Sequence, residues 1–83
     1  MEVVYKEAQD TVYGILSATF EIESARLTPD TRLIEDLDLD SIDLVELAIQ
    51  LQDSVTQSVE VEQVRQVKTV GDVIDMLVKY KQH

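Results

Sequence analysis

The chain has 83 residues, seventeen acidic against seven basic ones, and a net charge of −10. Its length favours one small domain over residues 1–83 with a modest core, since a chain of this size buries only about 60% of its unfolded surface. The charge argues against nucleic acid or anionic lipid as a partner and favours basic partner surfaces, while the lack of cysteine excludes disulfides and thiolate metal sites.

No apolar run is long enough to span a membrane. Met1 is followed by an acidic, amphipathic segment rather than by a basic and then an apolar one, so no signal peptide is expected. A soluble cytoplasmic protein is therefore the default expectation, and the chain is expected to be a monomer.

The first predicted element is an amphipathic helix from about Val3 to Ala18, because its apolar residues recur at the spacing of one helical face. That face contains Val4, Ala8, Val12, Ile15 and Leu16. The apolar residues of the segment 19–40 follow neither the helical nor the strand spacing for long. They recur singly along it, which favours an ordered loop held against the core. Those residues are Phe20, Ile22, Leu27, Leu33 and Leu37. A short helical turn fits the sequence near Pro29–Leu33.

A second helix is predicted to begin at Ser41, because Asp40 is a good N-cap and Asp43 places another carboxylate in the first turn. Its apolar residues fall on two faces. The wide face contains Leu44, Leu47, Ala48, Leu51 and Val55. The narrow strip contains Ile42, Val45 and Ile49, interleaved with Glu46 and Asp53.

Burying the narrow strip would also bury Glu46 and Asp53 without partners, at a high cost in free energy. The wide face is therefore assigned to the core, and the narrow strip is expected to be exposed. Exposed apolar strips of this kind are typical of partner sites, although ordinary scatter of surface hydrophobic residues is the alternative.

Two shorter elements are expected after the second helix. The valines at 61, 64 and 67 favour a short third helix within Val59–Gln66 that closes one side of the core. Thr69 is expected to cap a last helix, with Asp72 as its reciprocal partner. The inward residues of that helix are Val70, Val73, Ile74, Leu77 and Tyr80. The predicted fold is all-α, a four-helix bundle with a long loop between helices 1 and 2.

Ser41 stands at the head of the exposed strip. A serine at a helix start is usually only a cap, but Asp40 immediately before it is the better cap and leaves the Ser41 hydroxyl free to point outward. A phosphate ester would suit this position, since the free N–H groups and the positive end of the helix stabilise a negative group. Hydrolase chemistry does not fit, because the only histidine is the C-terminal His83 and no glycine elbow surrounds the serine.

Asp36, Asp38 and Asp40 alternate as at the start of a calcium-binding loop. That interpretation fails, because Ser41 stands where glycine is needed and Leu47 where a bidentate glutamate is needed. No metal site is predicted.

A family resemblance rests on Glu35-Asp36-Leu37, Leu39-Asp40-Ser41-Ile42-Asp43 and Val45-Glu46-Leu47, together with Thr69-Val70-Gly71-Asp72 at the last helix. This pattern resembles the phosphopantetheine attachment region of acyl carrier proteins and covers nearly the whole chain. Asp38 stands where the family commonly has a glycine, and Ile42 replaces its usual leucine.

The resemblance implies that Ser41 carries 4′-phosphopantetheine, donated by coenzyme A through a separate phosphopantetheinyl transferase. It implies a discrete acyl carrier protein for fatty-acid, lipid or polyketide biosynthesis, acted on by partner enzymes rather than an enzyme itself. Acyl-transferring or synthase partners would dock through basic surfaces on a docking strip of apolar and acidic residues. That strip consists of Asp40, Ile42, Asp43, Val45, Glu46 and Ile49.

Two alternatives stay open. One is a specialised carrier of an aminoacyl group or another carboxylate, which shares the attachment chemistry but differs in cargo. The other is an unmodified acidic interaction module, in which Ser41 is only a cap or a phosphorylation site.

Overall fold

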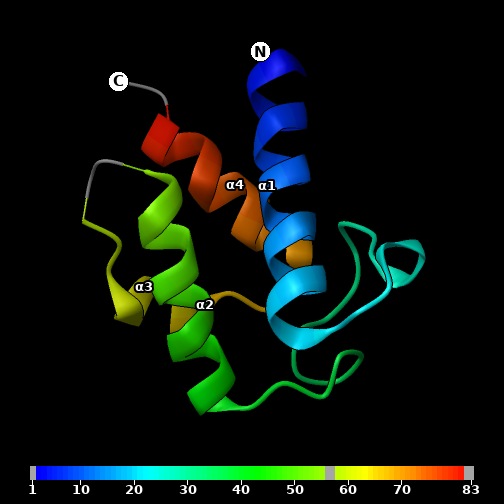
Figure 1. Cartoon of the computed structure of the whole chain (residues 1–83). Coiled ribbons are helices and arrows are strands. Elements are labelled where there is room, and N and C mark those ends of the chain that lie inside the picture. The colour runs from blue at the N-terminus through cyan, green and yellow to red at the C-terminus, as the bar shows by residue number, and fades with distance from the viewer. Residues whose placement is uncertain (1, 56–57, 82–83) are drawn as a thin grey trace.

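The computed structural model describes residues 2–55 and 58–81; His83, to which no role is assigned, lies outside them. Over the described residues the chain forms four α-helices, no β-strand, and one 3₁₀ turn. The elements are α1 (Glu2–Phe20), η1 (Ser24–Arg26), α2 (Ser41–Ser54), α3 (Val61–Gln66) and α4 (Val70–Lys81). Figure 1 shows α1 and α2 running in opposite directions, with α4 crossing between them and the short α3 beside α2. The predicted all-α, four-helix architecture is confirmed.

The core lies where α1, α2 and α4 meet. The predicted inward faces of α1 and α4 are confirmed at Ala8, Val12 and Leu16 and at Val70, Val73, Ile74 and Leu77, all of which are buried. α1 is slightly longer than predicted and is followed by Glu21, whose φ of 57° turns the chain out of the helix. The chain then enters the long connection to α2.

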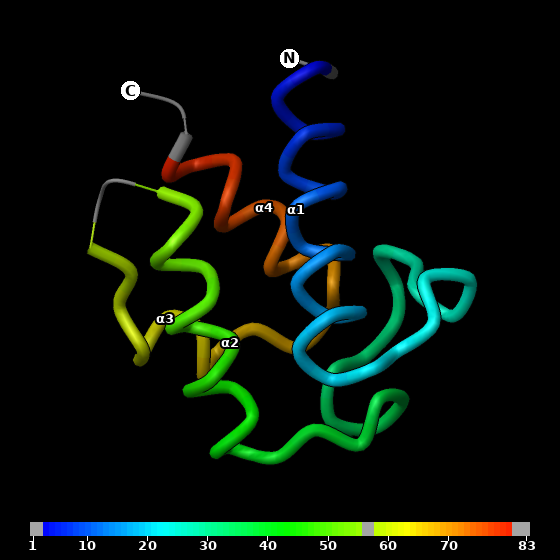
Figure 2. Tube along the Cα trace, in the orientation of Figure 1, coloured from blue at the N-terminus to red at the C-terminus, as the bar shows by residue number. Residues whose placement is uncertain are grey.

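That connection is ordered, as predicted, and Figure 2 shows it leaving the bundle to one side before it returns under α1 to α2. It is held by the burial of Ile22, Leu27, Leu33 and Leu39. The prediction of a helical turn near Pro29–Leu33 was wrong, because the only helical turn of this connection is η1 at Ser24–Arg26.

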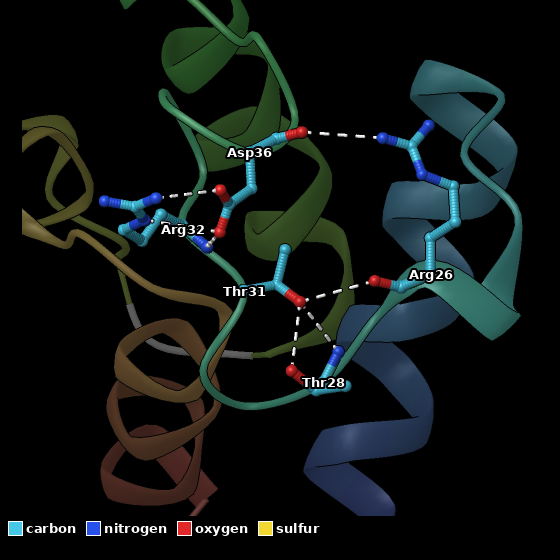
Figure 3. Close-up of polar contacts among 5 residues, drawn as sticks. All are labelled: Arg26, Thr28, Thr31, Arg32 and Asp36. Carbon is cyan, nitrogen blue, oxygen red and sulfur yellow. Dashed lines mark hydrogen bonds and ion pairs between the residues drawn. The ribbon is translucent and has the colours of Figure 1, made fainter.

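Hydrogen bonds over residues 26–33 explain why no helical turn forms there. The Thr31 hydroxyl donates to the Arg26 carbonyl at 3.3 Å and accepts from the Thr28 N–H at 3.0 Å, so it braces a tight turn (Figure 3). The Leu33 N–H then donates to the Lys68 carbonyl at 2.9 Å. Because this bond draws the chain into an extended bridge, Arg32 pairs with Thr69 instead of continuing a helix.

The start of α4 is joined to the same loop by further backbone bonds. The Val70 N–H donates to the Thr31 carbonyl, and the Gly71 N–H to the Pro29 carbonyl, each at 2.8 Å. Asp72 accepts from the Thr69 N–H while the Thr69 hydroxyl accepts from the Asp72 N–H, which is the predicted reciprocal cap. Hydrogen bonds from the backbone N–H groups of residues 68 and 69 lower the pKa of Asp72.

The third helix is shorter than predicted, and one of the three valines that predicted it does not face the core. Val64 is buried and residue 67 is half-buried, but Val61 is exposed. α3 has only six residues, so a single buried side chain fixes which way it faces. Tyr80 is half-buried rather than inward, and its hydroxyl donates to Gln63 Oε1 at 2.6 Å, joining α4 to α3.

Replacing glycine by alanine should have opposite effects on stability at the two glycines of the chain. At Gly71 an added Cβ would lie 2.8 Å from the Pro29 carbonyl oxygen, whereas at Gly14, inside α1, it would meet nothing within 4 Å. We expect Gly71→Ala to destabilise the fold by about 1–3 kcal/mol through overpacking against backbone. Gly14→Ala should stabilise it by about 1 kcal/mol through higher helix propensity. Urea unfolding of both variants measures this, and equal effects would contradict the assigned loop contact.

Candidate functional site

The start of α2 is fixed by a reciprocal pair of side-chain caps. Asp40 Oδ1 accepts from the Asp43 N–H at 2.9 Å, and Asp43 Oδ2 accepts from the Asp40 N–H at 3.0 Å. The predicted helix start at Ser41 and the predicted cap at Asp40 are therefore confirmed. Because Asp40 does the capping, the Ser41 hydroxyl has no hydrogen-bond partner among the described residues, and Ser41 is exposed.

This arrangement can hold a phosphate ester. The N–H groups of Ser41 and Ile42 precede the first intrahelical bond, which the Leu44 N–H makes to the Asp40 carbonyl at 3.1 Å. An anion on the Ser41 oxygen would lie at the positive end of the fourteen-residue α2. The exposed hydroxyl and the helix end together fit a phosphodiester-linked group.

The residue two positions before the cap has an unusual backbone conformation. Asp38 has a φ of 62°, in the left-handed region that glycine adopts most easily. The glycine common at this position in the resembling family is thus replaced by a residue that takes up the same conformation. Aspartate is one of the few other residues to visit this region without a large penalty.

An acidic loop, residues 32–39, precedes the cap. Arg32 forms a two-pronged ion pair with Asp36, its Nη2 lying 3.1 Å from Oδ1 and its Nε 3.3 Å from Oδ2 (Figure 3). The hydrogen bonds from the Arg32 side chain and backbone lower the pKa of Asp36, and the same pair raises the pKa of Arg32. Arg32 was not predicted from the sequence, although its spacing of four residues from Asp36 was a usable signal.

The two faces of α2 are divided as predicted. Leu44, Leu47, Ala48 and Leu51 are buried, and Val55 at the helix end is half-buried. On the docking strip, Ile42 is 76% exposed, Ile49 53% and Val45 38%. Glu46 lies beside them and accepts a hydrogen bond from the Gln50 amide at 2.8 Å, which holds its carboxylate in place along the helix.

The strip also keeps its negative charge. The ion pairs found in the described part of the chain join Lys6 to Asp10, Arg32 to Asp36, and Arg65 to Glu62, and none involves a docking-strip residue. Asp40, Asp43 and Glu46 therefore have no ion-pair partner within the described part of the chain. The structure brings all six predicted docking residues together with Ser41 on the first turns of α2.

A groove of about 540 Å³ lies elsewhere, between α3 and α4. Its lining residues are Gln63, Gln66, Val67, Asp72, Asp75, Met76, Lys79 and Tyr80. None of these belongs to α2 or to the loop before it, so the groove is separate from Ser41. Among residues 2–55 and 58–81, no cluster of three or more acids or histidines could hold a metal ion, and no helix is long and apolar enough to cross a membrane.

An all-helical bundle with an exposed serine at an acid-capped helix start fits a carrier-type protein. Residues 10–77 match the family model of the phosphopantetheine attachment site. The chain is 46% identical over 68 residues to acyl carrier protein 2 of Ralstonia nicotianae, covering 82% of this chain and 84% of the relative. It is 34% identical to the acyl carrier protein of Thermobifida fusca, covering 89% and 94% of the two chains.

A third relative is the meromycolate extension acyl carrier protein of Mycobacterium leprae, which is 30% identical over 99% of this chain and 71% of the relative. The chain belongs to the acyl carrier protein family. It is an acyl carrier whose cofactor is covalently attached 4′-phosphopantetheine, as the resemblance predicted.

The division of α2 into two faces can be tested with two substitutions that each remove three carbons. Leu47 is fully buried, so Leu47→Ala should leave a cavity and cost about 2–5 kcal/mol. The exposed Ile49→Ala should change stability by less than about 0.5 kcal/mol. Thermal and urea unfolding would measure both. If Ile49→Ala proved the more damaging, the inward and outward faces would be exchanged.

Proposed function

We propose that Ser41 is the residue that carries 4′-phosphopantetheine. The observation that carries this assignment is the exposed Ser41 hydroxyl, which has no partner among the described residues because Asp40 and Asp43 cap the helix between themselves. Ser41 also lies inside the matched residues 10–77. The attached group supplies a thiol that holds acyl groups as thioesters. The protein contributes an exposed ester oxygen and the positive helix end that stabilises the phosphodiester.

We propose that partner enzymes bind the docking strip. A phosphopantetheinyl transferase must reach Ser41, and acyl-transferring or synthase enzymes must reach the same place to use the thiol. The uncompensated acids Asp40, Asp43 and Glu46 suit basic partner surfaces and would speed the encounter, while the three apolar side chains would be covered in the complex. The tethered arm would raise the local concentration of the acyl group at each partner's active site.

The cargo is proposed from the relatives. Acyl intermediates of fatty-acid, lipid or polyketide biosynthesis fit a chain whose relatives are named acyl carrier proteins, one of them for meromycolate extension. We propose a discrete carrier formed by residues 1–83, monomeric and cytoplasmic, that leaves catalysis to its partners. An aminoacyl or other carboxylate cargo would use the same Ser41 chemistry. An unmodified interaction module would leave the free Ser41 hydroxyl without a role.

The assignment of Ser41 predicts a single modification. Incubation with coenzyme A and a broad-specificity transferase should add one phosphopantetheinyl group, and Ser41→Ala should abolish the addition. Ser24→Ala is the matched control, because Ser24 is another exposed serine at a helical start, hydrogen-bonded to Ser17 at 3.0 Å. Intact mass and peptide mapping provide the readout. An unmodified wild-type chain, or an adduct on another serine, would refute the proposal.

The docking strip predicts a charge effect that depends on position. Glu46→Lys should slow modification by about three- to tenfold at low salt, because it reverses a steering charge beside Ser41. Glu7→Lys on α1 changes the net charge equally but lies on an exposed position of another helix, so it should have little effect. The modification rates of the two variants should become equal as salt is raised, since exposed charges are screened. Equal slowing by both would indicate a net-charge effect and no docking strip.

A further inference from the structure

The acidic loop before Ser41 is closed on itself. The Leu39 N–H donates to the Leu33 carbonyl at 3.1 Å, and the Leu37 N–H donates to the Arg32 carbonyl at 3.1 Å. Leu33 and Leu39 are both buried, so the two ends of the loop are anchored in the core. Asp40 follows Leu39 directly, and the position of the α2 cap therefore depends on how this loop closes.

Asp36 joins the two sides of that loop. Besides its two contacts with the Arg32 guanidinium, Asp36 Oδ2 accepts from the Arg32 backbone N–H at 2.9 Å. The Arg32 carbonyl in turn accepts from the Asp36 N–H at 3.0 Å. A second arginine, Arg26, approaches from η1, with Nη2 3.5 Å from the Asp36 carbonyl oxygen (Figure 3). Asp36 thus accepts hydrogen bonds from four donor groups, three of Arg32 and one of Arg26.

Asp36 differs from the other acids around Ser41 because it has a basic partner. Six acids lie between Glu35 and Glu46 without a basic residue among them. Among the described residues, Asp36 is the one of these six that forms an ion pair. Without Arg32, its carboxylate would add to the repulsion among neighbouring acids and favour an open loop. Both side chains are exposed, and such pairs contribute little to global stability, so their effect is on the loop itself.

We propose that the Arg32–Asp36 pair is a positioning clamp for the modification of Ser41, holding residues 32–39 closed so that Leu39, Asp40 and Ser41 are presented to the transferase in one arrangement. This inference rests on the proposed role of Ser41. When the clamp is lost, only a fraction of molecules has the competent loop. The apparent affinity for the transferase falls by that fraction, while turnover of the bound carrier is unchanged.

The test compares two arginines in exposed ion pairs. Arg32→Gln removes the clamp, and Arg65→Gln removes the same charge from the pair with Glu62 on α3. With the full chain as varied substrate, Arg32→Gln should raise the KM of modification at least about threefold and leave kcat within about twofold. Arg65→Gln should change neither. Arg32→Lys keeps the positive charge but cannot form the two-pronged contact with Asp36. Its KM should therefore lie between those of wild type and Arg32→Gln.

A purely structural role would give a different result. It would lower the melting temperature of Arg32→Gln without changing KM at an assay temperature well below the transition. Backbone amide NMR adds a readout that needs no enzyme, since loss of the clamp should shift and broaden the Leu39 and Ser41 resonances. If Arg32→Gln fails to fold, Asp36→Asn removes the charge pair while keeping an acceptor for the Arg32 N–H, and the same increase in KM is expected.

The outcomes separate the two proposals. If wild type is modified at Ser41 but Arg32→Gln and Arg65→Gln have the same KM, the clamp is overturned and the attachment site stands. If wild type is not modified at all, the proposed function fails and the clamp fails with it. A rise in KM confined to the Arg32 and Asp36 variants, with kcat preserved, supports the clamp.

Discussion

The backbone pairing between the long loop and the start of α4 is the constraint on which the rest of the structure depends. Three N–H groups, of residues 33, 70 and 71, cross between these segments. They hold a connection that has almost no helix of its own against a helix far away in sequence. Leu33 is buried as a result, and Leu39 is brought back to the core six residues later, which sets where α2 begins. The exposed position of Ser41 follows from this distant contact as much as from its own cap.

The charges of the chain show how stability and partner binding oppose each other. Acids crowd the region around Ser41, where the compact fold would gain from counter-charges, yet the ion pairs of the described residues lie to either side of the docking strip. Glu46 is held by the neutral amide of Gln50 rather than by a base. A hydrogen bond from a neutral amide holds the Glu46 carboxylate in place but does not neutralise its negative charge. The strip can therefore attract a basic surface, while self-repulsion weakens the fold locally.

Features set by neighbouring residues could be predicted from the sequence. The start of α2 follows from two aspartates three residues apart, and its two faces follow from helical periodicity and from the cost of burying Glu46 and Asp53. The cap of α4 is equally local. Ser41 was identified for the same reason, because the better cap stands directly before it.

Features that depend on distant contacts could not be predicted. The absence of a helical turn at Pro29–Leu33 depends on the bond from the Leu33 N–H to the carbonyl of Lys68, which lies far along the chain between α3 and α4. Val61 is exposed because α3 is short and its orientation is fixed by Val64 and by the bond from Tyr80 to Gln63. The left-handed Asp38 belongs instead to a local turn, in which the Asp38 N–H donates to the Ile34 carbonyl and the Leu39 N–H to the Leu33 carbonyl, and the glycine common there in the family was a usable signal for it.

The pairing of the loop with α4 has a consequence for the order of events during synthesis. Ser41 leaves the ribosome well before residues 68–71, which supply the carbonyl and N–H partners for the loop ahead of it. Until those residues emerge, Leu33 has no backbone partner across the bundle and the core lacks α4. Ser41 thus reaches its final setting only when residues 68–71 have been made. A transferase that requires the folded site and acts on Ser41, as proposed, would therefore find that site only after residues 68–71 have been made.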